Sequence, residues 1–547
     1  MRLPGLVGSL ACVCLISCGS AGSRRDGSPE ALSPRVKRDL AGELETMAAG
    51  WDGMHRGKAR DRRLAEEQYE EALAGFLKTW TKAQNPHDWQ NAQIFDPVGR
   101  DGGYVVEFDR PNPRQRGASP LEYDDFIMPR SVVPHSGDTE AVRAGMGVPL
   151  VGHIKRTEAV RAEMPFLPPK GGNFTLTATM HFAEKAADGT RRCHLRLHNT
   201  LNTDTVEAPG GERQLAADFT APKHLALSRR AFGLLSLQGL LYPEKALGDC
   251  QLYRMDEYDP NRIPVVFVHG LMSDPHIWLN VVNAICADKM LRKKYQPWYF
   301  LYPTAMGVPQ ASAMLRQSLE AARNHFDPDH NDPGMNRMVL VGHSMGGLLS
   351  RMQVTDSGSH LWDNIFTKPP QKMNVSEKAR QSLTTALFVK PLPYVSRTVF
   401  IATPHRGSTI ASLNIVRRLT SLIRIPLDSL TMANEILYGN TDALSPQITK
   451  WGVFSFVSIG MLSEQHPFLQ GLNKTTPAAS HHSIIGDRGR SGPREQSSDG
   501  VVPYWSSHLE TAKSEQMVPH GHGCVEDREV VQEVVRVLRE HLDSRDR

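Results

Sequence analysis

The C-terminal half of the sequence predicts an α/β fold, in which a mostly parallel β-sheet has helices on both faces. Five short apolar runs recur there: IPVVFVHG (263–270), WYFLYP (298–303), RMVLVGHS (337–344), RTVFIATPHRGS (397–408) and HHSIIGD (481–487). Helical stretches separate the runs, such as residues 311–325 and 347–354. Continuous apolar strands that alternate with helices are typical of a parallel sheet that is buried on both sides. Ligands bind outside the carboxyl ends of such strands.

A smaller N-terminal region, residues 39–255, predicts mixed helical and β-rich structure before an α/β domain at residues 256–547. Residues 35–92 predict helices, because apolar side chains recur at helical spacing among charges. These side chains are Leu64, Tyr69, Leu73, Phe76, Leu77 and Trp80. Residues 172–220 alternate apolar and polar residues around an Asp-Gly turn signal, which predicts a β-hairpin or part of a sandwich. Residues 221–243 predict a helical bridge, and no pattern in this region points to a function.

The first residues differ from the rest. An apolar run from Leu3 to Ile16 is too short for a permanent membrane span, and Ser17 and Cys18 follow it. This pattern resembles a bacterial lipoprotein signal, with a plain secretory signal as the alternative. The resemblance implies a signal peptide at residues 1–17, lipidation of Cys18 and a polar tether at residues 18–38. It also implies an exported protein held by its lipid anchor at the outer membrane or periplasmic face of a Gram-negative cell.

Charge and cysteine content narrow the classes of partner. The net charge is only +4 over 547 residues, and the two signs are interspersed, so we expect no nucleic-acid partner. Four cysteines remain after the signal and Cys18: Cys193, Cys250, Cys286 and Cys524. Their spacing predicts no metal site and leaves open whether they form disulfides or stay as thiols.

The third apolar run ends in Gly342-His343-Ser344-Met345-Gly346, which fits the pattern G-x-S-x-G. The pattern has a physical meaning where a strand turns sharply into a helix, because the turn exposes the serine hydroxyl at the helix N-terminus. The preceding strand and the following helical stretch give Ser344 that context. We therefore interpret Ser344 as a nucleophile.

A serine nucleophile needs a base, and the base needs an orienting carboxylate. Asp499 in SSDGVVP (497–503) and His522 in MVPHGHG (517–523) follow Ser344 in the order serine, acid, histidine. Asp487 and His520 remain the alternative acid and base.

Two further histidines lie near the predicted carboxyl edge of the sheet. His343 lies inside the motif, and we expect it to have a packing or positional role. His405 would line the site or form a hydrogen bond within its loop.

An oxyanion hole needs two backbone N–H donors. By their position in the motifs, Met345 and Leu271 are the candidates, since Met345 follows the serine and Leu271 follows His269-Gly270 at the end of the first core strand.

The ordered motifs of residues 262–542 resemble α/β-hydrolases of the lipase and esterase type, including bacterial triacylglycerol lipases and esterases related to GPI inositol-deacylases. The motifs are the HG loop, GHSMGG, TPHRGS, DGVVP and a late GH before the last helix. The resemblance covers about half of the chain. It implies an α/β-hydrolase fold and a Ser344–His522–Asp499 triad. Residues 357–396 and 409–455 are candidate cap insertions. Many relatives bind calcium, but no second set of aspartates is present, so we expect no metal and no cofactor.

These features predict a serine hydrolase that cleaves carboxylic esters, with an ester or lipid as its substrate. Two alternatives stay open: acyl transfer to a lipid or sugar hydroxyl, and a surface lipoprotein that binds without catalysis. The sequence does not specify the acyl chain or the oligomeric state.

Overall fold

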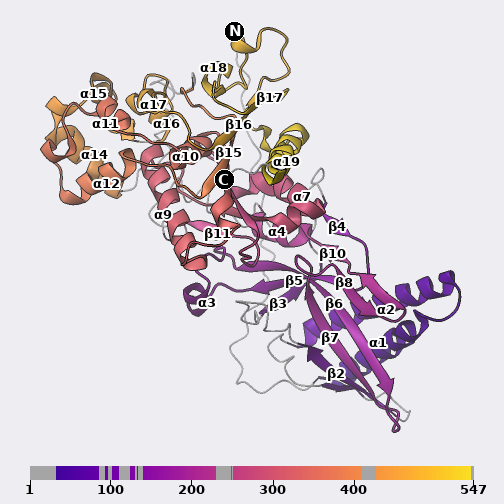
Figure 1. Ribbon diagram of the computed structural model, residues 1–547. Coiled ribbons are helices and arrows are strands. Elements are labelled where there is room, and N and C mark those ends of the chain that lie inside the picture. The colour runs from indigo at the N-terminus through magenta and orange to yellow at the C-terminus, as the bar shows by residue number, and fades with distance from the viewer. Residues whose placement is uncertain are drawn as a thin grey trace, which may run out of the picture.

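A computed structural model describes residues 32–84, 93–95, 102–109, 123–129, 132, 140–228, 248, 250–408, 427–456 and 458–543. A six-stranded sheet with two long helices forms the N-terminal part, and a seven-stranded sheet between helices forms the C-terminal part (Figure 1). The predicted signal peptide and Cys18 lie outside the described residues. Helix α1 (Pro34–Gly53) begins before residue 38, so the end of the expected tether is helical.

The seven-stranded sheet has the order β11-β13-β12-β14-β15-β16-β17. Its strands are β11 (Leu252–Arg254), β12 (Ile263–Val268), β13 (Tyr295–Phe300), β14 (Met338–His343), β15 (Val395–Ile401), β16 (Ser480–Gly486) and β17 (Ser514–Val518). Strand β11 is antiparallel to β13, and the other neighbours are parallel. The prediction of a mostly parallel sheet is confirmed, and each of the five apolar runs overlaps a strand. Strand β11 lies before residue 256, so this sheet begins inside the expected N-terminal region.

Both faces of this sheet are buried, which explains why its strands are continuously apolar. In β14, Met338 and Leu340 contribute to one core, whereas Val339 and Val341 contribute to the other. Helices α9 (Val308–Phe326) and α10 (Met345–Gln353) pack on the first face. Helices α7 (Leu279–Ala287) and α19 (Arg528–Asp543) pack on the second.

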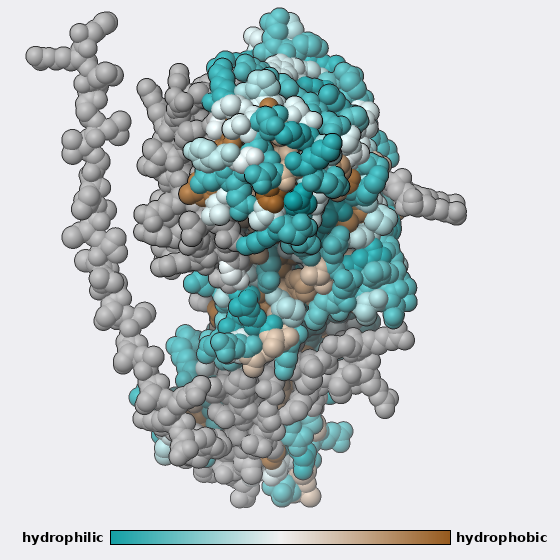
Figure 2. Space-filling model, turned by 90° about the vertical axis from the view of Figure 1, so that its left-hand side faces the viewer, coloured by the Kyte–Doolittle hydropathy of each residue, from teal (hydrophilic) through white to brown (hydrophobic). Residues whose placement is uncertain are grey.

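The candidate cap insertions contain helices that gather in a lobe beside the sheet (Figure 1). Residues 357–396 include α11 (His360–Ile365) and α12 (Glu377–Leu387), and residues 409–455 include α14 (Leu427–Gly439) and α15 (Pro446–Trp451). Residues 409–426 lie outside the described part. Apolar side chains of α11 belong to the same core as those of α9 and α10. Among the described residues, the face in Figure 2 is mostly hydrophilic, with hydrophobic residues scattered over it. The other α-helices in the described part of this domain are α8 (Lys289–Lys294), α16 (Ser458–Met461), α17 (Pro467–Leu472) and α18 (Tyr504–Ser507).

The N-terminal sheet has the order β1-β2-β7-β6-β5-β3. Its strands are β1 (Gln93–Phe95), β2 (Tyr104–Asp109), β3 (Asp125–Ile127), β5 (Val148–Ile154), β6 (Gly172–Lys185) and β7 (Arg191–Asn199). The predicted hairpin is confirmed, because β6 and β7 pair antiparallel. Two short pairs accompany the sheet: β4 (Val142–Arg143) with β10 (Ala217–Asp218), and β8 (Thr205–Ala208) with β9 (Gly211–Gln214).

Helices α1 and α2 (Ala59–Ala83) pack together against this sheet. The apolar residues whose spacing predicted this helix are buried in α2, except Leu64, which is 54% exposed. Tyr69 ties α2 to the sheet, since its hydroxyl donates to the carbonyl of Met180 and accepts from the same residue's N–H. Helix α3 (Glu158–Glu163) lies between β5 and β6 in the chain.

The two parts share a buried junction. Helix α4 (Thr220–Leu227), the start of the predicted helical bridge, contacts both β6 and α7. Lys223 of α4 forms an ion pair with Asp256, and both side chains are buried. The Arg292 guanidinium lies 4.3 Å from the centre of the Phe219 ring. The N-terminal part therefore packs directly on the α/β domain.

Cys193, Cys250, Cys286 and Cys524 are free thiols, so the disulfides that the sequence left open are not formed. No helix in the described ranges has both the length and the apolar character needed to cross a bilayer.

Candidate active site

Ser344 lies at a strained turn between β14 and α10. Its φ of 52° and ψ of −123° are unusual for a residue with a side chain. The neighbouring glycines allow this turn, because a Cβ atom at Gly346 would lie 2.2 Å from the Val268 carbonyl oxygen and one at Gly342 would lie 2.5 Å from the Gly346 carbonyl oxygen. A Cβ at Gly347 would meet the Thr403 hydroxyl. The G-x-S-x-G pattern thus reflects close backbone contacts around one serine.

The structure brings Ser344, His522 and Asp499 together. His522 Nε2 lies 2.9 Å from Ser344 Oγ, and His522 Nδ1 lies 2.7 Å from Asp499 Oδ2. A carboxylate oxygen only accepts, so Nδ1 carries the proton and Nε2 is free to accept the hydrogen bond from the serine. Ser344 and His522 are 178 positions apart in the chain, and Asp499 and His522 are 23 apart, yet the three form one continuous line of hydrogen bonds.

The Asp499 carboxylate is fixed on both sides. Its side chain is 1% exposed, and its Oδ1 accepts hydrogen bonds from the N–H groups of Val501 at 2.8 Å and Val502 at 2.6 Å. These bonds leave Oδ2 directed at the imidazole. A buried carboxylate with three donors orients the ring and stabilises positive charge that develops on it.

The alternative acid and base lie in other contacts. His520 contacts Glu529 at 2.9 Å and Asp527 at 3.2 Å. Asp487 accepts a hydrogen bond from the N–H of Gly489 in its own loop. Of the candidates that the sequence left open, the structure brings only His522 and Asp499 into line with Ser344.

The other two candidate histidines are buried and neutral. His343 Nε2 lies 2.8 Å from the main-chain carbonyl oxygen of His522, and burial lowers the pKa of His343 to about 3. His405 packs edge-on against Phe400, and burial, with Arg351 nearby, holds its pKa well below the ordinary value. Within the described ranges neither ring nitrogen of His405 has a hydrogen-bond partner, so the expected loop hydrogen bond does not involve its ring.

The candidate oxyanion loop lies against the serine. A Cβ atom at Gly270 would lie 3.0 Å from the Ser344 Cβ, so the chain that carries Leu271 passes directly beside the nucleophile. The Tyr302 hydroxyl donates to the carbonyl oxygen of His269 at 2.8 Å, and the two rings stack. Met345 is the first residue of α10, where N–H groups have no partner within the helix. Both candidate donors therefore border Ser344.

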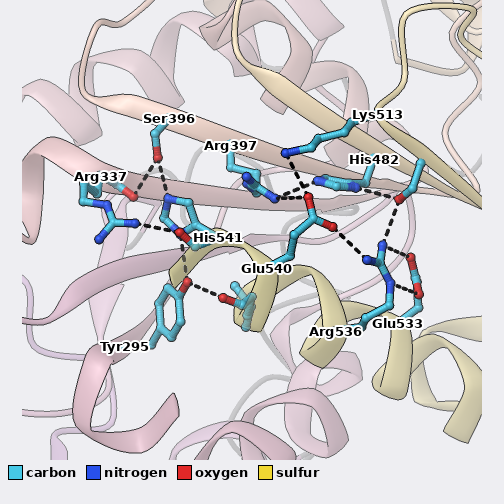
Figure 3. Close-up of polar contacts among 12 residues, drawn as sticks. Tyr295, Arg337, Ser396, Arg397, His482, Lys513, Glu533, Arg536, Glu540 and His541 are labelled. Carbon is cyan, nitrogen blue, oxygen red and sulfur yellow. Dashed lines mark hydrogen bonds and ion pairs between the residues drawn. The ribbon is translucent and has the colours of Figure 1, made fainter. Parts of the chain in front are cut away.

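A polar network holds the C-terminal helix, which follows the His522 loop, against the sheet (Figure 3). The Glu540 carboxylate accepts from Arg397 of β15 at 3.1 Å and pairs with Lys513 at 3.0 Å. His541 contacts the Tyr295 hydroxyl at 2.8 Å and the Ser396 hydroxyl at 2.9 Å. Sequence reasoning missed this network, because polar residues on an amphipathic helix are typical of a solvent-facing side. The network anchors α19 beneath β13 and β15.

No group of three or more His, Cys, Asp or Glu side chains has a metal-binding arrangement in the part of the chain that the structure describes.

Comparisons with known proteins give similarity to solved lipases and esterases. No protein-family model and no curated protein matches the sequence. A Bacillus licheniformis lipase in mature form is 15% identical, with 52% of this chain and 97% of that chain covered and a TM-score of 0.31. The Staphylococcus hyicus lipase is 14% identical, with 52% of this chain and 97% of that chain covered and a TM-score of 0.32. A lipase-esterase related protein from Clostridium acetobutylicum is 12% identical, with 52% of this chain and 98% of that chain covered and a TM-score of 0.28. Identities and TM-scores this low assign no function to this chain.

Proposed function

We propose that this protein is a serine hydrolase that cleaves carboxylic esters. The observation that carries the proposal is the line of hydrogen bonds from Ser344 Oγ through His522 to Asp499, at 2.9 and 2.7 Å. A serine hydroxyl is inert by itself and becomes a nucleophile when a neutral imidazole accepts its proton. The tautomer that Asp499 imposes leaves His522 Nε2 ready for that step.

The residues then act in sequence. Ser344 Oγ attacks the ester carbonyl carbon while its proton passes to His522 Nε2. The N–H groups of Leu271 and Met345 stabilise the negative charge on the carbonyl oxygen. The imidazolium gives the proton to the departing alkoxide, which leaves as an alcohol, and an acyl-enzyme remains on Ser344. Water then attacks the acyl carbon with His522 as base. The carboxylic acid is released, and the Ser344 hydroxyl is restored.

The test is hydrolysis of a series of p-nitrophenyl esters of increasing acyl length by the full chain and by Ser344→Ala. Loss of the nucleophile should lower kcat by several orders of magnitude. Ser359→Ala is the matched control, since Ser359 is an exposed serine of the helical lobe and should keep full activity. A fluorophosphonate probe should label the wild type and not Ser344→Ala. Equal hydrolysis by the wild type and Ser344→Ala would refute the proposal.

The same assay separates hydrolysis from acyl transfer. With glycerol added as a competing acceptor, a hydrolase gives mainly free acid, whereas an acyltransferase gives mainly the new ester.

We also propose that the chain is exported and anchored to a membrane through a lipid on Cys18. The support is the sequence pattern alone. Labelling cells with a fatty-acid analogue tests it, and Cys18→Ser should abolish the label.

A further inference from the structure

We propose that His343, the residue before the nucleophile, positions the base by holding the main chain of His522. The inference deepens the proposed function and rests on it. His343 does not touch the reacting atoms. It acts through the loop that carries His522, so it is a positioning residue.

The direction of the hydrogen bond is fixed by chemistry. His343 Nε2 lies 2.8 Å from the carbonyl oxygen of His522. A carbonyl oxygen only accepts, so Nε2 of His343 must carry a proton and donate it. His343 Nδ1 is then an acceptor, and within the described ranges it has no hydrogen-bond partner. The ring therefore makes one specific polar contact, and that contact is with the residue proposed as the base.

The anchor at the other end of this contact is rigid. His343 is the last residue of β14, at the centre of the seven-stranded sheet, and it is 7% exposed. A Cβ atom at Gly270 would lie 3.1 Å from His343 Nδ1, so the oxyanion loop closes over the other edge of the ring. A buried ring in contact with both loops can transmit the position of β14 to the His522 loop.

The neutral state of His343 also suits this role. Burial, and then the neighbouring His522, lower its pKa to about 3. The two ring centres are 5.1 Å apart. During acylation His522 becomes an imidazolium, and a second positive charge at this distance would oppose that step. A neutral donor holds the base without repelling its charged form.

The loop needs such a tether because the sheet alone does not place it. The His522 loop follows β17, which is the edge strand three positions from β14 in the sheet. With strands about 4.8 Å apart, the loop must reach back roughly 14 Å to meet Ser344. At the end of this reach, His522 accepts a hydrogen bond from His343 on its main-chain carbonyl, and its ring contacts Asp499 and Ser344. Two residues earlier, the carbonyl of His520 accepts from the N–H of Arg488.

The test compares two variants of the full chain on one p-nitrophenyl ester. In His343→Leu the ring volume is roughly kept and the donor is lost, whereas in His343→Gln an amide N–H replaces Nε2–H at a similar distance from the backbone. We expect kcat to fall roughly 10- to 100-fold in His343→Leu, because small misplacements of catalytic groups cost about this much. KM should stay within about threefold, since the tether is not part of substrate binding. His343→Gln should recover most of the lost kcat.

Thermal unfolding of both variants shows whether each is folded. If His343→Leu does not fold, His343→Asn takes its place, because its shorter amide does not reach the His522 carbonyl. Wild-type kcat in the variant without the donor would overturn the inference. An equal loss of kcat in the variant without the donor and in His343→Gln would also overturn the inference, because the shape of the ring and not its hydrogen bond would then be the cause. Failure of the proposed function gives a different result: Ser344→Ala would keep full activity.

Discussion

Replacing Asp499 by asparagine tests the tautomer argument most directly. Oδ1 of Asp499 accepts from the N–H groups of Val501 and Val502, so only the oxygen of an asparagine amide can occupy that position. The amide NH₂ must then point at His522 Nδ1, which has to become an acceptor. His522 Nε2 would carry the proton and donate to Ser344 instead of accepting from it. The variant keeps the shape of the site and loses its base.

The expected loss in kcat is about 10⁴-fold, the size that such an aspartate-to-asparagine change produces in a serine–histidine–aspartate site. It corresponds to about 5.4 kcal/mol at about 1.36 kcal/mol per factor of ten. The assay is steady-state hydrolysis of a p-nitrophenyl ester near neutral pH, with urea unfolding to show that stability is retained. Asp487→Asn is the matched control, because its Oδ1 can still accept from Gly489 and full activity should remain. Asp499→Asn with more than a tenth of the wild-type kcat would refute the reasoning.

Two predictions concern stability. Lys223→Met leaves Asp256 charged and buried without its partner, so the free energy of unfolding in urea should fall by about 3–5 kcal/mol, and Lys223→Met combined with Asp256→Leu should recover most of it. A double variant no more stable than Lys223→Met alone would contradict this account of the junction. Burial opposes charge on His508, but hydrogen bonds and charge from Glu515 and Glu510 outweigh it and raise the His508 pKa above 6.5. The contribution of protonated His508 to stability is therefore complete below pH 6.5 and is lost as the pH rises through the raised pKa of His508 in the folded protein. His508→Gln should have a lower free energy of unfolding than the wild type, and the difference should be larger at pH 5.5 than at pH 9. An equal difference at both pH values would contradict this.

Burial on both faces made the core strands predictable from the sequence. Five strands appear as apolar runs because their two faces contribute to two cores. Strand β17 (Ser514–Val518) is largely polar because it is an edge strand, and β11 (Leu252–Arg254) is too short to show a pattern. Neither strand was predicted. Leu64 fits the helical spacing of its neighbours and is nevertheless exposed, since one apolar residue does not decide which face of a helix is buried.

The candidate site was predictable where a residue type and its position in a motif agree. Ser344 follows from the strand–turn–helix pattern. The choice between Asp499 and Asp487, or between His522 and His520, depends on which loop reaches β14, and spacing along the chain does not contain that information. The contact from His343 was also hidden, because the position between glycine and serine in the pattern accepts many residue types. Only the burial and the carbonyl contact of the ring identify it.

The geometry separates what places the nucleophile from what places the base. Ser344 follows a central strand, and glycine contacts with the neighbouring backbone fix its turn, so the sheet itself positions the hydroxyl. His522 follows the edge strand β17, and α19 after it is anchored beneath the sheet by Glu540 and His541 (Figure 3). These anchors hold the ends of the segment, and the N–H of Arg488 holds the carbonyl of His520. At the tip, the contacts with His343 and Asp499 are the tethers of His522 itself. Changes in the tethers should therefore impair proton transfer while Ser344 stays in place, whereas changes in the glycines should displace the nucleophile itself.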